Sequence, residues 1–542
     1  MDQIQRAGDS LVRALTLHQY AFLLLASLGY FAITLYRAER RPFWFDELFT
    51  LYISRLPDLR SIWSALTHGV DQNPPMLYLL THWSQAAFGA NELGARIPQV
   101  VGFWVFCLCL YRFVSIRTNA LAGFIALLLP ITTRGYWYAY EARSYGVVLG
   151  FFGLALISWQ AATDRSSRRW IPLAGLAVSL TGAALFHCYT FLFFVPFGVG
   201  ELVRTFQRRR LDTAVWCALL IPAIVSVATV LPLLHGLRGT QAPDVIGNPW
   251  QNIGSGWDLS VHRTLTLALF LLISAWSVAG LPSGKPLADS FAWHEIACLA
   301  GILCTPLVAF CAALAAHVQL FGRYSLITMA GAACLIGAAC ARSRIVGLLV
   351  LFAILVIITK QFAGFRRGTW VVVPNSDLAV GTRSANDNFS LEFVETSAHR
   401  DEPIVLMDPQ EFAAISHYAP PPIRSWFVYL LPDLTIAGYV RPQQCCGGPG
   451  KLTDAQNVGG ADYFRLQQCC GAPGTITSKE AFFAAHRSFF VYGGGDLYPV
   501  DLRRLSTFFR PPAGEITLLG CKDGRCLFHV ALSLETNLIR NQ

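Results

Sequence analysis

Long apolar runs separated by short polar segments occupy the chain from Tyr20 to about Lys360. Runs long enough to cross the ~30 Å hydrocarbon layer predict about eleven membrane-spanning helices. We expect them at residues 20–36, 97–114, 119–133, 145–160, 170–186, 189–205, 213–234, 263–281, 293–316, 324–341 and 345–361. The apolar runs then stop. The pattern therefore predicts a polytopic α-helical membrane domain followed by a soluble domain.

One apolar segment, PPMLYLLTHWSQAAF at 74–88, does not fit the pattern of a span. It is short and includes His82, Trp83 and Gln85, which suits a helix lying at the membrane surface better than a helix that crosses it. Counting it as a span would also place the Arg-rich loops on opposite sides. We therefore expect residues 37–96 to form one large loop with interfacial helices.

Short loops rich in Arg and Lys predict the orientation, because cytoplasmic loops carry the excess of these residues. Such loops lie at 115–118, 161–169, 206–212, 282–292 and 342–344, and the count of spans places all of them on one side. No small-residue cleavage site follows the first apolar run, so we expect a retained anchor and a cytoplasmic N-terminus at 1–19. The outward set is then 37–96, 134–144, 187–188, 235–262, 317–323 and everything after about 362.

Composition agrees with this topology. Apolar residues make up 54% of the 542 residues and charged residues 14%, whereas a soluble protein carries about 25% charged residues. The formal net charge of +9 comes mainly from short loops between apolar runs, so it reflects topology and does not indicate a nucleic-acid partner. We expect a multi-pass protein of the plasma or inner membrane, in contact with lipids.

The remainder, residues 362–542, is predicted to be a small extracytoplasmic α/β domain. Short strands are expected at 403–407, 426–431 and 489–493, with a helix near EFAAISHY, and a final hairpin is written ITLLGCKDGRCLFHVAL. In that hairpin Cys521 and Cys526 face each other across the Asp523-Gly524 turn.

Six of the 15 cysteines lie in this domain. Four of them form the near-repeats QQCCGGPGKLT at 443–453 and QQCCGAPGTIT at 467–477. An even set outside the cytoplasm favours disulfides. The doublets lack the C-x-x-C spacing of zinc knuckles, so disulfide-pinned loops are a better interpretation than a metal site. The duplication itself suggests no function.

Four groups of polar residues fall on the predicted outer side. They are Asp46 and Glu47 in FWFDE; Asp71 and Asn73 before Pro74-Pro75, with His82 following in the same loop; Tyr140, Glu141, Arg143 and Tyr145 in YAYEARSY; and Arg323 and Tyr324 in FGRYS. Separate loops on one side can converge on a single cavity. We therefore take these residues as the candidate site.

Each group also has a structural explanation. Asp46 and Glu47 could cap the N-terminus of an interfacial helix, where carboxylates are favoured. Glu141 and Arg143 could form an ordinary ion pair, and Arg323 could extend to the lipid headgroups. The segment at 71–75 could be a turn between helices, and His82 and His187 could be packed or interfacial. The combination of all groups on one side is harder to explain in this way.

Glycosyl transfer from a lipid-linked phosphosugar would use these residues together. The leaving group is a phosphate at the headgroup plane, which Arg143 and Arg323 could bind and stabilise as the sugar departs. The acceptor hydroxyl needs a general base, and a carboxylate among aromatic side chains has a raised pKa that suits this role. Asp46 fits the base, and Glu47 could orient the acceptor or a metal.

The same motifs resemble a known family. FWFDE after the first helix, D-x-NPP-x-x-Y, ANELGARIP before the second span, YxYEARSY before the fourth and GRY later are similar to those of GT-C fold glycosyltransferases. The branch concerned is that of protein O-mannosyltransferases and bacterial aminoarabinose transferases, often labelled family 39. The resemblance covers roughly residues 20–345.

This resemblance implies a polyprenyl-phosphate sugar donor, inversion at the anomeric carbon and catalysis on the outer face. It places Asp46 as the catalytic acidic residue, with Glu141, Arg143, Arg323 and Tyr324 near the donor phosphate. A divalent metal is possible, although the chain lacks a second DxD-type motif. The acceptor, whether glycan, lipid or protein, and the sugar stay open.

Two other classes have many helices and polar loops. A transporter or lipid flippase would tend to carry ionisable residues in the middle of its spans and to show inverted repeats, whereas the ionisable residues here gather at helix ends. A non-catalytic scaffold with a sensory outer domain would not need paired acidic and basic motifs. The enzyme interpretation is therefore preferred.

Overall fold

The structure is a computed structural model. It describes residues 2–164, 168–237, 249–260, 290–316, 321–366, 402–406, 409–419, 424–431, 466–467, 469–494, 514–522 and 525–532. The chain divides into two compact units. The helical unit comprises Met1–Arg40, Gln72–His235 and Pro243–Trp370, and the C-terminal unit comprises Arg41–Asp71, Gly236–Ala242 and Val371–Gln542.

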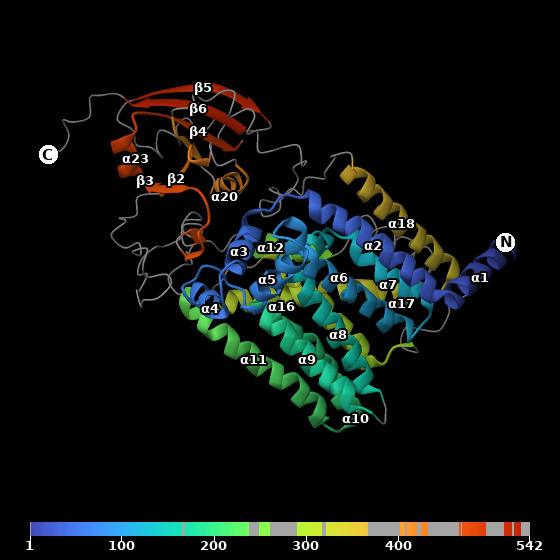
Figure 1. The fold of residues 1–542 in the computed structure, drawn as a ribbon. Coiled ribbons are helices and arrows are strands. Elements are labelled where there is room, and N and C mark those ends of the chain that lie inside the picture. The colour runs from blue at the N-terminus through green and yellow to red at the C-terminus, as the bar shows by residue number, and fades with distance from the viewer. Residues whose placement is uncertain are drawn as a thin grey trace. The chain divides into compact units, whose positions relative to one another are not determined.

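The helical unit is a bundle of mostly apolar helices joined by short connections (Figure 1). Its elements are α1 (Asp2–Leu17), α2 (Gln19–Arg40), α5 (Met76–Phe88), α6 (Glu92–Ser115), α7 (Ala120–Thr132), η1 (Arg134–Tyr140), α8 (Tyr145–Thr163), α9 (Trp170–Phe186), η2 (Cys188–Phe193), α10 (Phe194–Arg208), α11 (Thr213–Leu237), α12 (Pro249–Ser260), α15 (Trp293–Leu303), α16 (Thr305–Ala316), η3 (Gly322–Ser325), α17 (Thr328–Cys340) and α18 (Arg344–Arg366).

Five helices in the described part of the chain are long and apolar enough to cross a membrane, namely α2, α6, α8, α11 and α18. Two bent pairs, α7 with η1 and α15 with α16, raise the number to as many as seven. Shorter apolar helices, α9 and α17, occupy two further predicted spans. The predicted fold class, a polytopic helical membrane protein, is confirmed. The predicted span at 263–281 lies outside the described residues.

One predicted span is bent, and the segment predicted to lie at the membrane surface is a short helix. The predicted span at 293–316 is bent by 55° between α15 and α16, because Pro306 has no N–H to donate and its ring clashes with the preceding turn. The segment at 74–88 forms α5, a helix of 13 residues that is ~20 Å long and too short to cross the hydrocarbon layer. Its Trp83 and Phe88 are exposed, as expected of a helix at a membrane surface.

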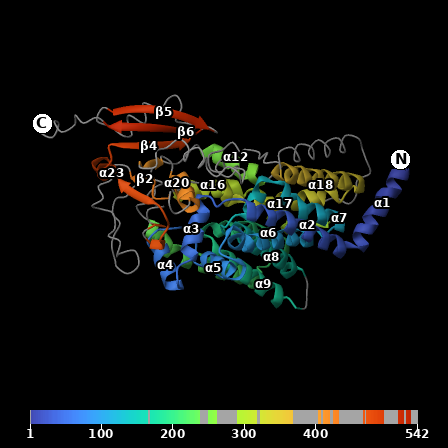
Figure 2. The same ribbon diagram turned by 45° about the horizontal axis from the view of Figure 1, so that its top comes forward.

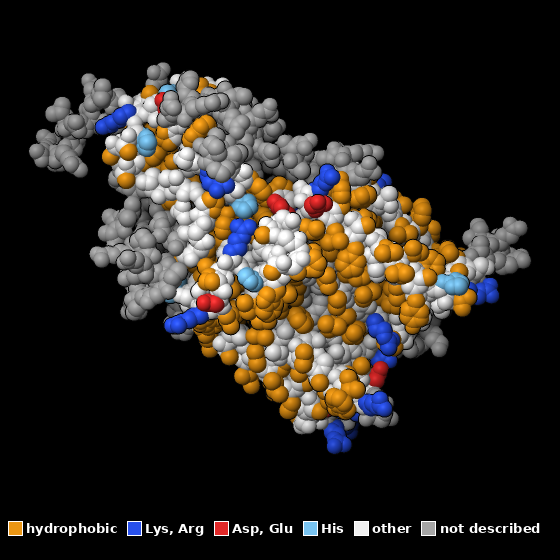
Figure 3. All heavy atoms as spheres, in the orientation of Figure 1, with side chains coloured by type: hydrophobic (Ala, Val, Ile, Leu, Met, Phe, Trp, Pro, Cys, Tyr) orange, Lys and Arg blue, Asp and Glu red, His pale blue; other side chains and the backbone are white. Residues whose placement is uncertain are grey.

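Apolar side chains cover much of the surface of the helical unit (Figure 3). Leu25 on α2, Ile224 on α11 and Phe352 on α18 are 62%, 67% and 67% exposed, respectively. Monomeric soluble proteins rarely expose contiguous apolar surface of this kind. The exposed apolar faces therefore fit helices that contact lipid.

Glycines bring α6 and α8 into close contact. A Cβ on Gly146 would lie 2.3 Å from the carbonyl oxygen of Gln99, and a Cβ on Gly150 would lie 2.6 Å from that of Gly102. Small residues at such positions let two helix backbones approach closely in a membrane. The side chain of Gln99 also accepts a hydrogen bond from the backbone N–H of Val147 at 3.0 Å. The start of α8 is thus held against α6.

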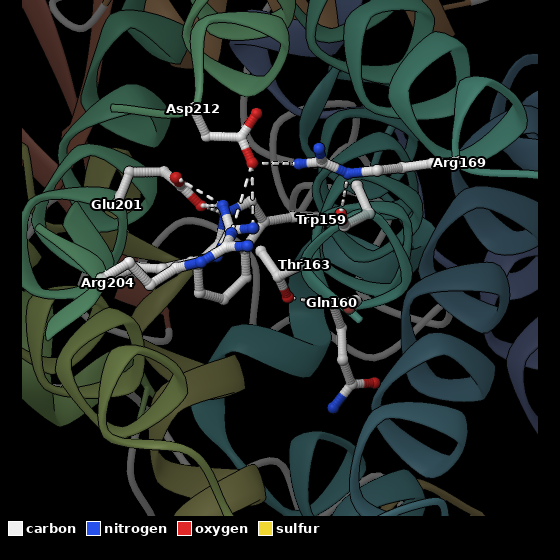
Figure 4. A network of polar contacts seen from close by, with 9 residues as sticks. Trp159, Gln160, Thr163, Arg169, Glu201, Arg204 and Asp212 are labelled. Carbon is white, nitrogen blue, oxygen red and sulfur yellow. Dashed lines mark hydrogen bonds and ion pairs between the residues drawn. The ribbon is translucent and has the colours of Figure 1, made fainter. Parts of the chain in front are cut away.

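Charged residues from two predicted cytoplasmic loops form a network with α8 and α10 (Figure 4). Arg204 pairs with Glu201 at 2.9 Å and with Asp212 at 2.9 Å, and Arg169 also pairs with Asp212. The indole N–H of Trp159 donates to Glu201 at 2.9 Å. Burial alone would raise the pKa of Asp212, but the guanidinium groups of Arg169 and Arg204 outweigh it and hold this pKa below its usual value.

A second cluster joins the predicted loops 115–118 and 161–169 to the start of α15. Arg117 binds Glu295 through two nitrogens, at 3.0 and 2.9 Å, and Asp164 at 2.7 Å. Gln160 donates to the same Glu295 carboxylate at 2.9 Å. Loops that the sequence places on one side of the membrane therefore contact one another in the structure. That this side is cytoplasmic stays a prediction.

The C-terminal unit contains a mixed six-stranded sheet (Figure 2). Its strands are β1 (Ile404–Leu406), β2 (Phe427–Leu431), β3 (Thr475–Ser478), β4 (Ser488–Gly494), β5 (Gly514–Lys522) and β6 (Arg525–Leu532), in the order β3-β2-β1-β4-β6-β5. The first four are parallel, and β4, β6 and β5 are antiparallel. Helices α20 (Pro409–Tyr418) and α23 (Lys479–Ala485) complete the α/β part.

The predicted α/β character of this region is confirmed. The strands expected at 403–407, 426–431 and 489–493 and the final hairpin are present, and Cys521 is the register partner of Cys526. Strand β3 was not predicted, because it is short and lies inside a segment that reads as a cysteine repeat. Residues 443–453 lie outside the described residues, so the disulfides stay a prediction.

Part of the first predicted outer loop belongs to the C-terminal unit. Residues Arg41–Asp71 form α3 (Phe45–Ser54) and α4 (Leu59–Thr67). Asp58 caps α4 by accepting a hydrogen bond from the backbone N–H of Ser61 at 2.7 Å. The structure therefore divides the segment 37–96, since residues from Gln72 onward lie in the helical unit.

Candidate functional site

The YAYEARSY segment forms a buried turn between two helices. Tyr140 ends η1, Tyr145 begins α8, and the side chains of Tyr140, Glu141, Arg143 and Tyr145 are all 9% exposed or less. The backbone N–H of Arg143 donates to the carbonyl of Glu141 at 2.7 Å, which closes the turn. Because α8 is packed backbone to backbone against α6, this turn has little freedom to move.

A small pocket opens beside the first turn of α8. Its polar lining residues come from three elements of the helical unit: Tyr145 from α8, His187, Tyr189 and Thr190 at η2, and Arg323 and Tyr324 from η3. Aliphatic and aromatic side chains line the rest. The structure therefore brings Tyr145 of the YEARSY motif beside Arg323 and Tyr324 of the GRY motif, while Glu141 and Arg143 are not among the lining residues. Their predicted role at a donor phosphate stays a prediction.

Aromatic rings order the wall of this pocket. Tyr189 and Tyr324 are stacked with ring centroids 3.6 Å apart and an interplanar angle of 15°. The ring of His187 lies 5.3 Å from that of Tyr145 and 6.0 Å from that of Tyr324. Each ring blocks other rotamers of its neighbours, so this packing restricts the motion of the pocket wall.

The tautomer of His187 follows from one hydrogen bond. The backbone N–H of Tyr189 donates to Nδ1 of His187 at 3.1 Å, so Nδ1 acts as an acceptor and carries no proton. In the neutral ring the proton is then on Nε2, which is a donor. His187 was interpreted from sequence as a packed or interfacial residue, but it lines the pocket. The signal for it was a polar pair, 187–188, between two apolar runs on the predicted outer side.

Close packing of η3 on α12 positions Arg323. A Cβ on Gly322 would lie 2.4 Å from Oγ of Ser255 and 3.0 Å from the backbone nitrogen of Gly256. The guanidinium carbon of Arg323 lies 4.6 Å from the centroid of the Phe321 ring. The arginine side chain therefore packs on Phe321, and Gly322 is required because a side chain there would meet the backbone of α12.

The D-x-NPP motif lies against the same region. Asn73 is buried, and the hydroxyl of Ser144 donates to its side-chain oxygen at 3.5 Å. The thiol of Cys188 donates to the carbonyl of Gln72 at 2.8 Å. The structure therefore places Asn73 beside the start of α8 and of η2. Asp71 is also buried and belongs to the C-terminal unit.

Asp46 and Glu47 lie in the first turn of α3, in the C-terminal unit. The carboxylate of Glu47 is fully buried, accepts from the backbone N–H of Trp44 at 3.2 Å and lies 3.9 Å from the guanidinium of Arg41. Glu47 therefore caps the helix, as one of the structural explanations anticipated. Asp46 is partly exposed. Its convergence with the pocket of the helical unit stays a prediction.

Two other sequence signals have structural roles. In ANELGARIP, Asn91 caps α6 by accepting from the N–H of Gly94 at 2.9 Å, and Arg96 donates to the carbonyl of Ala38 at 2.7 Å. A cation at the last carbonyls of a helix is favourable, so Arg96 holds the end of α2. His82 is exposed on α5 and does not line the pocket.

Arg37 was missed from sequence. It lies in the last turn of α2, is 6% exposed, and its guanidinium lies 5.3 Å from the ring of Tyr136 and 5.9 Å from that of Tyr140. Cation–π contacts of this kind are strongest when the cation is desolvated. The sequence signal was a charge directly after the first predicted span, to which we assigned no role.

Metal binding has no evident ligand set among the residues that the structure describes. No three His, Cys, Asp or Glu side chains there come together as a metal site needs. The divalent metal considered from sequence is therefore assigned no residues.

Comparison with known proteins identifies a similarity of fold only. No protein-family model and no curated protein matches the chain. Crystal structures of ArnT from Cupriavidus metallidurans, bound to undecaprenyl phosphate and in the apo state, are each similar with 12% identity and a TM-score of 0.48. The two matches cover 94% and 95% of this chain and 98% of ArnT.

Proposed function

We propose that the chain is a membrane glycosyltransferase. It would move a sugar from a polyprenyl-phosphate-linked donor to an acceptor hydroxyl on the outer face, with inversion at the anomeric carbon. The acceptor is a glycan, a lipid or a protein. The donor class and the stereochemistry rest on the resemblance of the FWFDE and YEARSY motifs.

The observation that carries this proposal is the pocket beside α8. It combines one guanidinium, from Arg323, with the Nε2–H of His187 and the hydroxyl groups of Tyr145, Tyr189 and Tyr324. Such a set of donors binds a phosphate and stabilises the negative charge that grows on it as the sugar leaves. The apolar residues in the same wall suit the first carbons of a lipid chain.

Deprotonation of the acceptor hydroxyl is assigned to Asp46. Glu47 is fully buried and caps α3 through Trp44, so it has little freedom to take a proton from a substrate. Asp46 is adjacent and partly exposed, which is what a general base that meets an acceptor requires. In this scheme Arg323 acts on the donor and Asp46 on the acceptor.

The base assignment is tested with Asp46→Asn in purified protein reconstituted in membranes. Loss of a general base is expected to lower the rate of sugar transfer by roughly 10²- to 10⁴-fold. Glu47→Gln is the matched control: its amide oxygen can still accept from Trp44, so the rate is expected to stay within about tenfold of the wild type. Undiminished transfer by Asp46→Asn would remove the base.

The pocket is tested separately by binding of a polyprenyl phosphate without sugar, measured by native mass spectrometry. Arg323→Met loses a charge-assisted contact and is expected to bind roughly 10- to 100-fold more weakly. Arg112→Met, an exposed arginine in the last turn of α6, serves as the control and should bind like the wild type. Equal binding by both variants would contradict a phosphate site. Lipid movement between leaflets without sugar transfer would favour a flippase instead.

A further inference from the structure

Within the C-terminal unit, we call the six-stranded sheet with α20 and α23 the sheet domain. Helix α20 of this domain packs on α3, the helix of the same unit that carries Asp46. Their contact is made by two consecutive residues at the end of α20, His417 and Tyr418. The sequence separation of the partners is 365 residues or more. Local chain geometry does not bring segments so far apart in sequence together, so this contact is a tertiary interaction.

Tyr418 holds the chain just before α3 begins. The backbone N–H of Phe43 donates to the hydroxyl oxygen of Tyr418 at 2.6 Å. Phe43 precedes the N-cap residue Trp44, so its N–H is outside the helix and would otherwise need another acceptor. The bond fixes the direction in which the chain enters the helix, three residues before Asp46.

His417 holds the far end of α3. The hydroxyl of Tyr52 and Nδ1 of His417 are 2.7 Å apart. Burial raises the pKa of Tyr52 to about 12, so the phenol stays protonated and donates, and Nδ1 accepts. The imidazole also packs edge-on against the rings of Phe43 and Tyr52, with centroids 5.9 and 5.7 Å apart. One side chain therefore contacts both ends of the helix.

The end of α20 is itself fixed to the sheet domain. The guanidinium of Arg424 donates to the carbonyl of Ala419 at 2.9 and 3.2 Å and lies 3.5 Å from that of His417. Phe412 and Ile415 on α20 are buried, and α20 packs on β1 and β2. His417 and Tyr418 thus project from a rigid support.

We propose that the sheet domain is a positioning element for Asp46, acting through His417 and Tyr418 on α3. The inference rests on the proposed role of Asp46 as the base. Holding α3 before its first turn and near its last turn restricts the rotation and the shift of the helix, and with them the direction of the Asp46 carboxylate. A misplacement of about 1 Å at a reacting group can cost roughly 100-fold in rate.

The test combines kinetics with hydrogen–deuterium exchange in the full-length protein. Tyr418→Phe removes the hydroxyl that accepts from Phe43, and His417→Leu removes the acceptor for Tyr52. Both are expected to lower kcat roughly 10- to 100-fold and to leave KM for the donor unchanged, because the pocket belongs to the helical unit. Peptides that cover 43–54 should exchange roughly fivefold faster.

Conservative rescue and a matched control separate positioning from a general loss of structure. His417→Asn places an oxygen near the position of Nδ1 and is expected to restore most of kcat and the slow exchange of α3. His486→Leu, at the end of α23, changes a histidine in the same domain that contacts Phe482 instead of α3. It should behave like the wild type, which would show that the domain tolerates such a change.

Wild-type kcat in both variants, or a lower kcat with unchanged exchange at 43–54, would overturn the positioning role. Failure of the proposed function gives a different result: Asp46→Asn would remain active while Tyr418→Phe still speeds exchange of α3. In that case the contact between α20 and α3 stands and the base must be sought elsewhere.

Discussion

Replacing Arg204 by Met is expected to destabilise the helical unit strongly. The side chain of Arg204 is 4% exposed and that of Glu201 is fully buried, so the substitution leaves a buried carboxylate without its main cation. Breaking a buried pair in this way costs about 3–5 kcal/mol in the free energy of unfolding. The remaining partner of Glu201, the indole N–H of Trp159 at 2.9 Å, is a single neutral donor and cannot compensate for the lost charge.

A double-mutant cycle makes the reasoning quantitative. Glu201→Gln keeps an oxygen for Trp159 and leaves Arg204 paired with Asp212, so it is expected to cost about 1–3 kcal/mol. With both substitutions no unpaired carboxylate is buried at residue 201. The double variant is then expected to lose about 2 kcal/mol less than the sum of the two single variants.

The assay is equilibrium unfolding in mixed micelles of increasing denaturing-detergent content, followed by tryptophan fluorescence. Arg208→Met is the matched control, because Arg208 is 47% exposed and lies 3.6 Å from Asp212. A surface pair of that kind contributes about 0–1 kcal/mol. The reasoning is refuted if Arg204→Met is as stable as Arg208→Met, or if the two single effects simply add.

Three further predictions concern packing and pH. Gly322→Ala places a methyl group against the backbone of α12, at the usual overpacking cost of about 1–3 kcal/mol. It should therefore weaken polyprenyl-phosphate binding in native mass spectrometry, whereas Gly254→Ala, whose added Cβ meets nothing within 4 Å, should not. Gly146→Ala forces α8 away from α6 and should lower the unfolding midpoint in the same micelle assay, whereas Gly198→Ala, with open space around it, should leave it unchanged. Asp212 has a depressed pKa in the folded protein. Its stabilising effect is therefore complete above its ordinary pKa of about 3.9 and is lost as pH falls through the depressed value. Asp212→Asn should flatten this low-pH decline of the free energy of unfolding, and an unchanged decline would contradict the ion pairs.

The apolar spans and the strands of the sheet could be predicted because both follow from one-dimensional patterns. A helix that crosses lipid must be long and apolar, and α2, α6, α8, α11 and α18 are. Strands β1, β2 and β4 lie within a residue of their predicted ends, because buried parallel strands appear as short apolar runs between turn residues. The clustering of Arg323 with Tyr145 followed from topology, which put both at outer helix ends.

The membership of α3 could not be predicted. Its assignment to the C-terminal unit depends on Tyr52 and Phe43 meeting two residues of α20, and no local pattern encodes a contact across such a separation. The roles of Asp46 and Glu47 were likewise inseparable in sequence. Only the direction of each carboxylate at the first turn of α3 shows that Glu47 caps the helix. His187 was missed because a histidine between apolar runs has the same pattern whether it packs or binds.

The contact between Tyr52 and His417 has a consequence for how the protein is made. These residues are 365 positions apart, and translation at ~5–20 residues per second separates their synthesis by roughly 20–70 s. Helix α3 leaves the ribosome early, yet its partner helix exists only after the last predicted span has been inserted. During that interval the surface of α3 that α20 covers is open to solvent or to chaperones, so folding of this unit can be completed only after the C-terminal segment has been synthesised.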